Sequence, residues 1–181
     1  AAFGSNCGIS DPQAICKAHD LCNRHGIDTI SAGAAISFAM ECFERGLLTS
    51  RDTGGYALTF GDARAMLQLL EQIVHRQGLG ALLAEGTKVA ADRMGQGAED
   101  FAIQVKGLDL PMHDPRWKQG LGLGYMVSPI GADHNDNVHD TSFDRRIGGY
   151  FSSLGAFEPL PLTDLSAAKV RLVFYGTTWQ L

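Results

Sequence analysis

Side chains that could take part in chemistry gather first in the segment 23–29, which reads NRHGIDT. Gly26 can adopt the positive φ that a helix C-terminus requires, and Asp28 and Thr29 offer oxygens that can cap a following helix. Asp28 therefore has two interpretations. Either it caps the next helix and nothing more, or it forms, with the backbone N–H groups of this corner, a site for a ligand.

A second polar group lies at 133–140, which reads DHNDNVHD and is the densest polar cluster in the chain. Imidazole and carboxylate suit zinc or manganese, so a hydrolytic metal site is one interpretation. Aspartate and asparagine also build turns, and a solvated loop of such residues is the more common outcome.

Three alternating glycines, Gly120, Gly122 and Gly124, imitate a nucleotide-binding loop. A dinucleotide fingerprint must follow a strand inside a βαβ unit, and the sequence predicts no such strand. We therefore disfavour nucleotide binding.

The elements that must position these residues are helical up to residue 106. Asp11-Pro12 is a helix start, and the apolar period that follows ends at Gly26. The next helix, up to Glu44, is apolar on nearly all sides and too short to cross a bilayer, so we expect it to be buried in protein. Further helices are expected after a Thr59–Asp62 capping box over 63–76 up to Gly78, over 82–94, and in a short stretch at 99–105.

From Gly107 the long periodic runs disappear. We expect an ordered loop region through 108–162 with helical turns near 121–127 and 144–150. A last helix, capped by Thr163 or Asp164, should run through Tyr175. No alternation of period two is sustained, so the predicted fold is all-α and multihelical, with two helical layers or subdomains and a long ordered loop region. We expect domains at 1–106 and 107–181.

Composition excludes several classes of partner. The chain has 181 residues, 45% of them hydrophobic and 19% charged, with a net charge of −5, which is typical of a soluble globular protein. It has no basic cluster and no membrane span, so nucleic acid and membrane are poor partners.

The four cysteines, at 7, 16, 22 and 42, contain no CxxC pair, and those on apolar helical segments are expected to be small buried hydrophobes. This favours a reducing, cytoplasmic setting. The chain starts AAFGS without a methionine and ends LVFYGTTWQL, so we expect a fragment of a longer protein.

The stretch 21–44 resembles the pterin-contacting segment of the tungsten-containing aldehyde ferredoxin oxidoreductases. That family has a D-x-x-G-[LI]-D motif followed by T-I-S-x-G and an apolar helix. Gly26, Ile27, Asp28 and Thr29 match the motif, while Asn23 stands where the strict motif has aspartate and so loses a charge. The resemblance implies that these five residues bind the pterin cofactor.

The stretch 114–134 resembles a second family segment of the form DPRG followed by spaced glycines and a closing D-H. Trp117 and Ile130 depart from its usual glycine and arginine. The family histidine that His134 matches lies near the tungsten, so the resemblance implies that His134 contacts substrate or moves a proton. His113 falls at a common tyrosine position and is interpreted as structural. The other histidines, at 19, 25, 75 and 139, are interpreted as surface or helix-end residues.

The resemblance implies the multihelical C-terminal portion of a tungsten bis-molybdopterin enzyme, with 1–106 as part of the pterin-binding domain. Such an enzyme oxidises an aldehyde to a carboxylate and passes electrons through a [4Fe–4S] cluster to ferredoxin. The family's cluster cysteines lie outside this chain, so we expect the fragment alone to be inactive. A homodimer is compatible with the resemblance.

Two alternatives remain open. One is a tungsten enzyme of the benzoyl-CoA reductase type. The other is a non-catalytic helical interaction module that has lost the cofactor, which the uncharged Asn23 and Ile130 favour.

Overall fold

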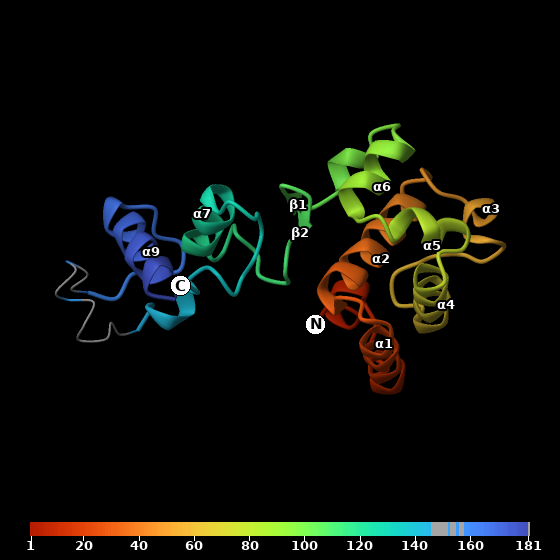
Figure 1. Ribbon diagram of the computed structural model, residues 1–181, viewed down its shortest axis with the longest axis horizontal. Coiled ribbons are helices and arrows are strands. Elements are labelled where there is room, and N and C mark those ends of the chain that lie inside the picture. The colour runs from red at the N-terminus through yellow and green to blue at the C-terminus, as the bar shows by residue number, and fades with distance from the viewer. Residues whose placement is uncertain (146–151, 153–154, 156–157, 181) are drawn as a thin grey trace. The chain divides into compact units, whose positions relative to one another are not determined.

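A helix that is apolar on nearly every face lies at the centre of the first part of the chain (Figure 1). This helix, α2 (Thr29–Glu44), is contacted by α1, α4, α6, the β-hairpin and two short 3-10 helices. The computed structural model describes residues 1–145, 152, 155 and 158–180, and the chain divides into one unit from Ala1 to Met112 and a second from His113 to Leu181.

The first unit consists of short and medium helices and one hairpin. In chain order they are η1 (Ser5–Cys7), α1 (Pro12–His25), α2 (Thr29–Glu44), α3 (Ser50–Thr53), α4 (Ala63–Val74), α5 (Gly78–Leu83), α6 (Thr87–Met94), η2 (Ala98–Phe101), β1 (Gln104–Val105) and β2 (Leu108–Asp109). The all-α prediction is confirmed, because the two-residue strands are the only sheet among the described residues.

Three aspartates start the three principal helices by the same chemistry. Asp11 accepts from the backbone N–H of Gln13 at 2.9 Å, Asp28 from that of Ser31 at 2.8 Å, and Asp62 from that of Arg64 at 2.9 Å. Each cap is worth about 1 kcal/mol. The expected Thr59–Asp62 capping box is wrong, because Asp62 is itself the N-cap residue. The capping box lies instead at Thr49–Asp52, on α3, a short helix that the sequence did not predict.

Two glycines in the middle of this unit place the helix boundaries at other positions than predicted. Gly78 begins α5 instead of ending the preceding helix, which closes at His75. Gly86, at a φ of 93°, separates α5 from α6, so the helix expected over 82–94 is two helices. Gly80 brings α5 against the backbone of α4 at Gln72, where a side chain would overlap main-chain atoms.

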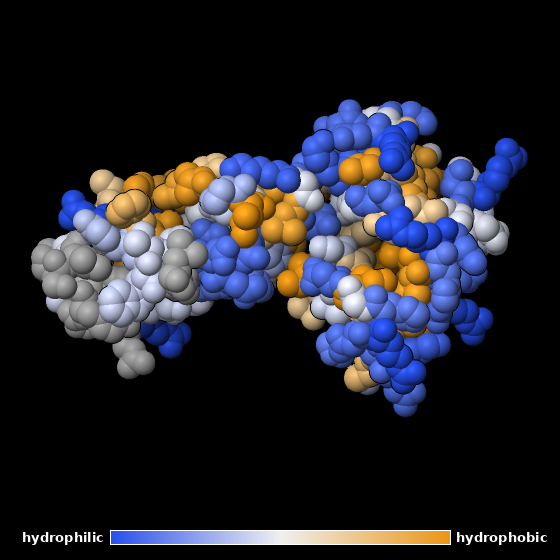
Figure 2. All heavy atoms as spheres, in the orientation of Figure 1, coloured by the Kyte–Doolittle hydropathy of each residue, from blue (hydrophilic) through white to orange (hydrophobic). Residues whose placement is uncertain are grey.

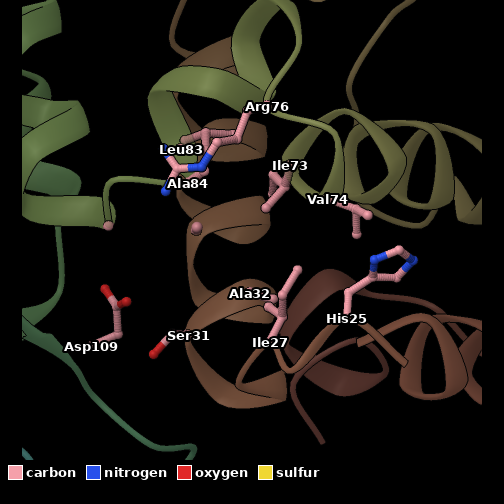
Figure 3. A pocket seen from close by; sticks show the side chains of 12 residues that line it. His25, Ile27, Ser31, Ala32, Ile73, Val74, Arg76, Leu83, Ala84 and Asp109 are labelled. Carbon is pink, nitrogen blue, oxygen red and sulfur yellow. The ribbon is translucent and has the colours of Figure 1, made fainter. Parts of the chain in front are cut away.

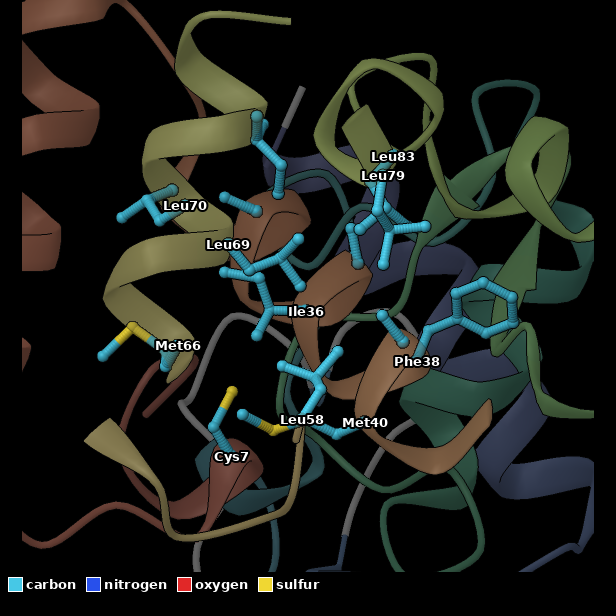
Figure 4. Close-up of a cluster of buried hydrophobic side chains, with 14 of the residues drawn as sticks. Cys7, Ile36, Phe38, Met40, Leu58, Met66, Leu69, Leu70, Leu79 and Leu83 are labelled. Carbon is cyan, nitrogen blue, oxygen red and sulfur yellow. The ribbon is translucent and has the colours of Figure 1, made fainter. Parts of the chain in front are cut away.

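The core of the first unit forms where α4 and α5 close over α2 (Figure 4). Ile36 and Met40 of α2 are fully buried, as are Met66, Leu69 and Leu70 of α4. Burial of such side chains contributes about 1.5–3 kcal/mol each, so this single cluster dominates the stability of the unit.

A tight hairpin ends the first unit and returns the chain to α2. Lys106 and Gly107 have φ values of 56° and 86°, as the two central residues of a type I′ turn require. Val105 pairs with Leu108 and Gln104 with Asp109. The short helix expected at 99–105 is therefore only the 3-10 turn η2, followed by β1. Because β2 contacts α2, the hairpin places Asp109 beside that helix.

The regular elements among the described residues of the second unit are α7 (Gln119–Val127), η3 (Asp140–Ser142) and α9 (Ala167–Gln180). The turns predicted near 121–127 are confirmed as α7, whereas those predicted near 144–150 fall largely outside the described residues. The last helix starts later than expected. Ser166 Oγ accepts from the backbone N–H of Lys169 at 3.4 Å, and Asp164 accepts from Ser166 instead of capping the helix.

Within the described part of the chain, no helix combines the length and apolarity that crossing a membrane would require.

Candidate functional site

The corner between α1 and α2 has the local structure that its sequence predicts. Gly26 adopts the left-handed conformation at a φ of 65° and closes α1. Asp28, which is exposed, turns its carboxylate back to the N–H of Ser31. Asn23 is exposed on the last turn of α1, where its amide lies 2.9 Å from His19 Nε2. Thr29 is the first residue of α2.

A cavity of about 310 Å³ opens beside this corner (Figure 3). Of the five predicted cofactor-binding residues, Ile27 lines it. Asn23, Gly26, Asp28 and Thr29 shape the corner without lining the cavity. Apolar side chains of α2, α4 and α5 form much of its wall. His25 and Val74 lie at one end of the cavity, and Ser31 and Asp109 lie at the other.

Asp109 is the residue of this cavity that sequence reasoning missed. Its side chain is only 5% exposed, and its Oδ1 has no hydrogen-bond partner among the described residues. Burial raises the pKa of Asp109, and the charge of Asp28 acts in the same direction, while the hydroxyl of Thr87 opposes them in part. Asp28 is therefore close enough to repel Asp109, which links the predicted corner to the cavity.

The polar end of the cavity can bind a donor-rich ligand. A buried carboxylate oxygen without a partner costs free energy unless a ligand supplies a donor. The buried hydroxyl of Thr87 lies near enough to Asp109 to lower its pKa, yet it makes no hydrogen bond of normal geometry to a described residue. A flat heterocycle with amino and ring N–H groups would satisfy Asp109 while its rings contacted the apolar wall. The signal in the sequence was a lone acidic residue between the leucines of LDLP.

A separate polar group forms in the second unit around His134. The rings of His113, His134 and His139 lie close together, with centroids 4.6–5.7 Å apart. Lys118 lies between two of them, with Nζ 3.3 Å from His113 Nδ1 and 3.2 Å from His139 Nδ1. All four side chains are half-buried. His139 was interpreted as a surface or helix-end residue; it is the N-cap residue of η3 and also a half-buried member of this cluster.

The loop 133–140 is held by its own hydrogen bonds and is partly buried, so it is not a simple solvated loop. No group of three or more His, Cys, Asp or Glu residues in the described chain could hold a metal ion. Asp133 Oδ1 accepts from the backbone N–H of Asn135 at 2.6 Å, as in a turn. Asn137 and Asp140 are nevertheless buried, at 2% and 3% exposure.

The alternating glycines explain that burial. Asp140 accepts from the backbone N–H groups of Gly120 and Leu121 at 3.0 and 2.8 Å, and a methyl group at Gly120 would lie 2.7 Å from its carboxylate. A methyl group at Gly124 would overlap Asn137. The glycines thus let the loop lie directly on α7, which is a packing function and not nucleotide binding.

Comparison with known proteins settles the family. The sequence matches the family model described as aldehyde ferredoxin oxidoreductase, domains 2 and 3, over residues 1–180. The chain belongs to this family. The resemblance predicted from the stretches 21–44 and 114–134 is therefore confirmed.

Curated relatives within the aldehyde ferredoxin oxidoreductase family are much longer than this chain. The tungsten-containing aldehyde ferredoxin oxidoreductase of Pyrococcus abyssi is 39% identical over 175 residues, which cover 95% of this chain and 27% of that protein. The protein of the same name from Thermococcus kodakarensis is 38% identical over 137 residues, covering 75% and 22%. The chain thus spans about a quarter of the length of these relatives.

One solved structure with a similar sequence is the active site complex BamBC of benzoyl coenzyme A reductase with 1,5-dienoyl-CoA. It is 32% identical, covers 59% of this chain and 16% of that chain, and has a TM-score of 0.46.

Cys22 and Cys42 are buried on α1 and α2, as predicted, whereas the prediction is wrong for Cys16, which is exposed on α1. Cys7, in η1, is also buried. Burial raises the pKa of Cys7 to about 12 and those of Cys22 and Cys42 to about 11. Burial therefore keeps these three thiols protonated at neutral pH.

Proposed function

We propose that this chain is the part of a tungsten bis-molybdopterin oxidoreductase that holds one pterin at the N-terminus of α2. The proposed reaction is oxidation of an aldehyde and water to a carboxylate, with two electrons leaving through a [4Fe–4S] cluster to ferredoxin. Ligands for that cluster are expected outside this chain, and the isolated chain is expected to be inactive.

The observation that carries the proposal is the orphaned carboxylate oxygen of Asp109 in a cavity beside the predicted pterin motif. A pterin presents an amino group and ring N–H groups, all of which are donors. The cavity presents an acceptor that lacks a donor, an apolar wall for the rings and the hydroxyl of Ser31. The residues present therefore fit the cofactor that the family implies.

Each residue of the corner has a distinct part in this proposal. Asp109 accepts from the pterin, and the nearby carboxylate of Asp28 adds negative potential that favours donor groups. Ile27, which lines the cavity, would contact the ring system. Asn23 and Gly26 determine the backbone path of the corner, and Thr29 begins α2, whose N-terminus would lie beside the bound cofactor. When bound, the tungstopterin supplies the two-electron redox chemistry.

His134 is the proposed catalytic residue of the second unit. A ring nitrogen of His134 would hydrogen-bond the substrate oxygen or accept a proton released when water adds to the aldehyde carbon. The remaining protein groups position substrate and exclude water.

The test uses the full-length protein, produced with tungstate and purified without oxygen. We expect stoichiometric tungsten and pterin, measured by elemental analysis and by fluorescence of the oxidised pterin, together with aldehyde-dependent reduction of ferredoxin. A folded protein without tungsten or pterin would overturn the proposal and favour the non-catalytic module suggested by Asn23 and Ile130. A metal-loaded protein that reduces benzoyl-CoA but ignores aldehydes would favour the benzoyl-CoA reductase type.

A further inference from the structure

The half-buried cluster around Lys118 has one self-consistent hydrogen-bond pattern. An ammonium group can only donate, so the Nδ1 atoms of His113 and His139 must both be acceptors. In a neutral imidazole the other nitrogen then carries the proton. His139 Nε2 lies 3.1 Å from the backbone carbonyl of His134, an acceptor, so the tautomer that Lys118 imposes is the one that can donate to this carbonyl.

We propose that Lys118 is a positioning residue for His134, acting through His139. Lys118 donates to His139 Nδ1, and His139 Nε2–H in turn donates to the carbonyl oxygen of His134. This chain of two bonds ties the start of α7, where Lys118 is the N-cap residue, to the loop that carries His134. His113 is the second acceptor for the same ammonium and keeps it in place.

The charges around the cluster agree with this geometry. Burial, Lys118, His139 and His134 all lower the pKa of His113, to about 4. Burial, Lys118 and His134 also lower the pKa of His139, against the opposing effects of its bond to the His134 carbonyl and of Asp140. Both imidazoles are therefore neutral at pH 7, as acceptors for an ammonium must be.

Other roles for the cluster fit less well. A metal ion would have to displace Lys118 from two ring nitrogens and the His134 carbonyl from a third. Two neighbouring carboxylates are already engaged, since Asp140 bonds Lys169 and Asp114 bonds Arg116. The proton chemistry of His134 in this inference rests on the proposed function, whereas the positioning of its backbone does not.

The test compares variants of the full-length protein. In Lys118→Met the ammonium is lost, and in His139→Leu both ring bonds are lost. Arginine at position 118 retains the donors, and glutamine at position 139 retains one acceptor and one donor at similar separations. Lys88→Met, which alters an exposed residue of α6, is the control.

Two measurements are made on each variant, namely hydrogen exchange of the 133–139 peptide and the kcat and KM of aldehyde oxidation. We expect Lys118→Met and His139→Leu to speed exchange about tenfold, as loss of one hydrogen bond would. We also expect them to lower kcat by about 10–100-fold with little change in KM. Lys118→Arg and His139→Gln should keep most of the wild-type exchange protection and most of the wild-type kcat. Lys88→Met should match the wild type in both measurements.

Wild-type exchange and kcat in Lys118→Met and His139→Leu, in an active enzyme, would overturn the inference and leave the proposed function standing. Failure of glutamine and arginine to restore either measurement would also overturn it. If instead exchange changes as expected but no variant oxidises aldehydes, the positioning holds and the proposed function fails.

Discussion

The two units of this chain are stabilised by different forces. The first unit buries an extended hydrophobic cluster around α2, to which α1, α4, α5 and α6 all contribute. Among the described residues of the second unit, the corresponding cluster has four buried members, Val138, Phe143, Leu172 and Val173. Instead, Asp140 and Lys169 form a buried ion pair at 2.5 Å, with side chains 1% and 3% exposed.

The two units also differ in the number of large apolar side chains exposed on their described surfaces. Among the described residues, Ile103 is the one exposed large apolar residue of the first unit, whereas the second unit exposes several, including Trp117, Met126 and Phe174. Apolar atoms are visible along one edge of the second unit in Figure 2. Because the apolar cluster among the described residues of the second unit is smaller and its buried polar bonds are specific, single substitutions should affect the two units differently.

The largest expected effect is on the buried ion pair of the second unit. Lys169→Met leaves the Asp140 carboxylate buried without its cation, which should cost about 3–5 kcal/mol. Hydrogen exchange read by mass spectrometry should show this loss in peptides of α7 and α9. Lys88→Met breaks an exposed pair with Asp92 and should cost about 0–1 kcal/mol. Equal effects of the two variants would contradict the importance of the buried pair.

Truncation of a core leucine should come next. Leu69→Ala in the fully buried cluster of the first unit should cost about 2–5 kcal/mol in the free energy of unfolding. Leu172→Ala should fall at the lower end of that range, because the four-residue cluster around it can collapse more easily. Urea unfolding followed by hydrogen exchange in each unit compares them, and a larger loss for Leu172→Ala would reverse the comparison.

Adding one methyl group tests the close approaches of helices. Gly80→Ala should cost about 1–3 kcal/mol, because the new Cβ overlaps backbone atoms of Gln72 that cannot rotate away. Gly124→Ala meets only the side chain of Asn137 and should cost less. Thermal unfolding of both variants, followed by circular dichroism, measures the difference. Equal melting temperatures for Gly80→Ala and the wild type would contradict the packing described.

The smallest effect is a pH dependence centred on Asp109. Because its pKa is raised in the folded state, stability falls as pH increases from its ordinary value of 3.8 through the folded value. Asp109→Asn removes this loss of stability. In the cofactor-free protein, the free energy of unfolding of the variant should therefore equal that of the wild type near pH 3 and exceed it at neutral pH. Urea unfolding at several pH values measures the difference in free energy of unfolding between variant and wild type. A difference that does not change with pH would contradict the burial of a charged Asp109.

Local features of the first unit could be predicted from the sequence because they depend on neighbouring residues. The caps at Asp11 and Asp28 and the αL conformation of Gly26 are examples. Glycines near helix ends were harder, since Gly78 can end one helix or begin the next. The family resemblance, which is confirmed, came from the motifs in 21–44 and 114–134, and capping and turn preferences alone do not explain the residues of these motifs.

The polar contacts of the second unit could not be predicted, because each joins distant positions. Asp140 bonds Lys169, which is 29 positions away, and Lys118 bonds His139, which is 21 positions away. Asp109 was missed for the same reason, since only the turn at Lys106-Gly107 brings it to α2. The part that a polar residue takes in a buried contact can be recognised only when its partners in the folded structure are known.

Pterin content of the full-length Asp109→Leu protein tests the central claim most directly. Leucine removes both carboxylate oxygens from a buried position where Oδ1 has no protein partner, so the apoprotein should remain folded. We expect pterin per polypeptide to fall about tenfold or more, as loss of a buried charged acceptor implies, and to stay at the wild-type level in the exposed control Asp92→Asn. Wild-type pterin content in folded Asp109→Leu protein would contradict the assignment of this cavity.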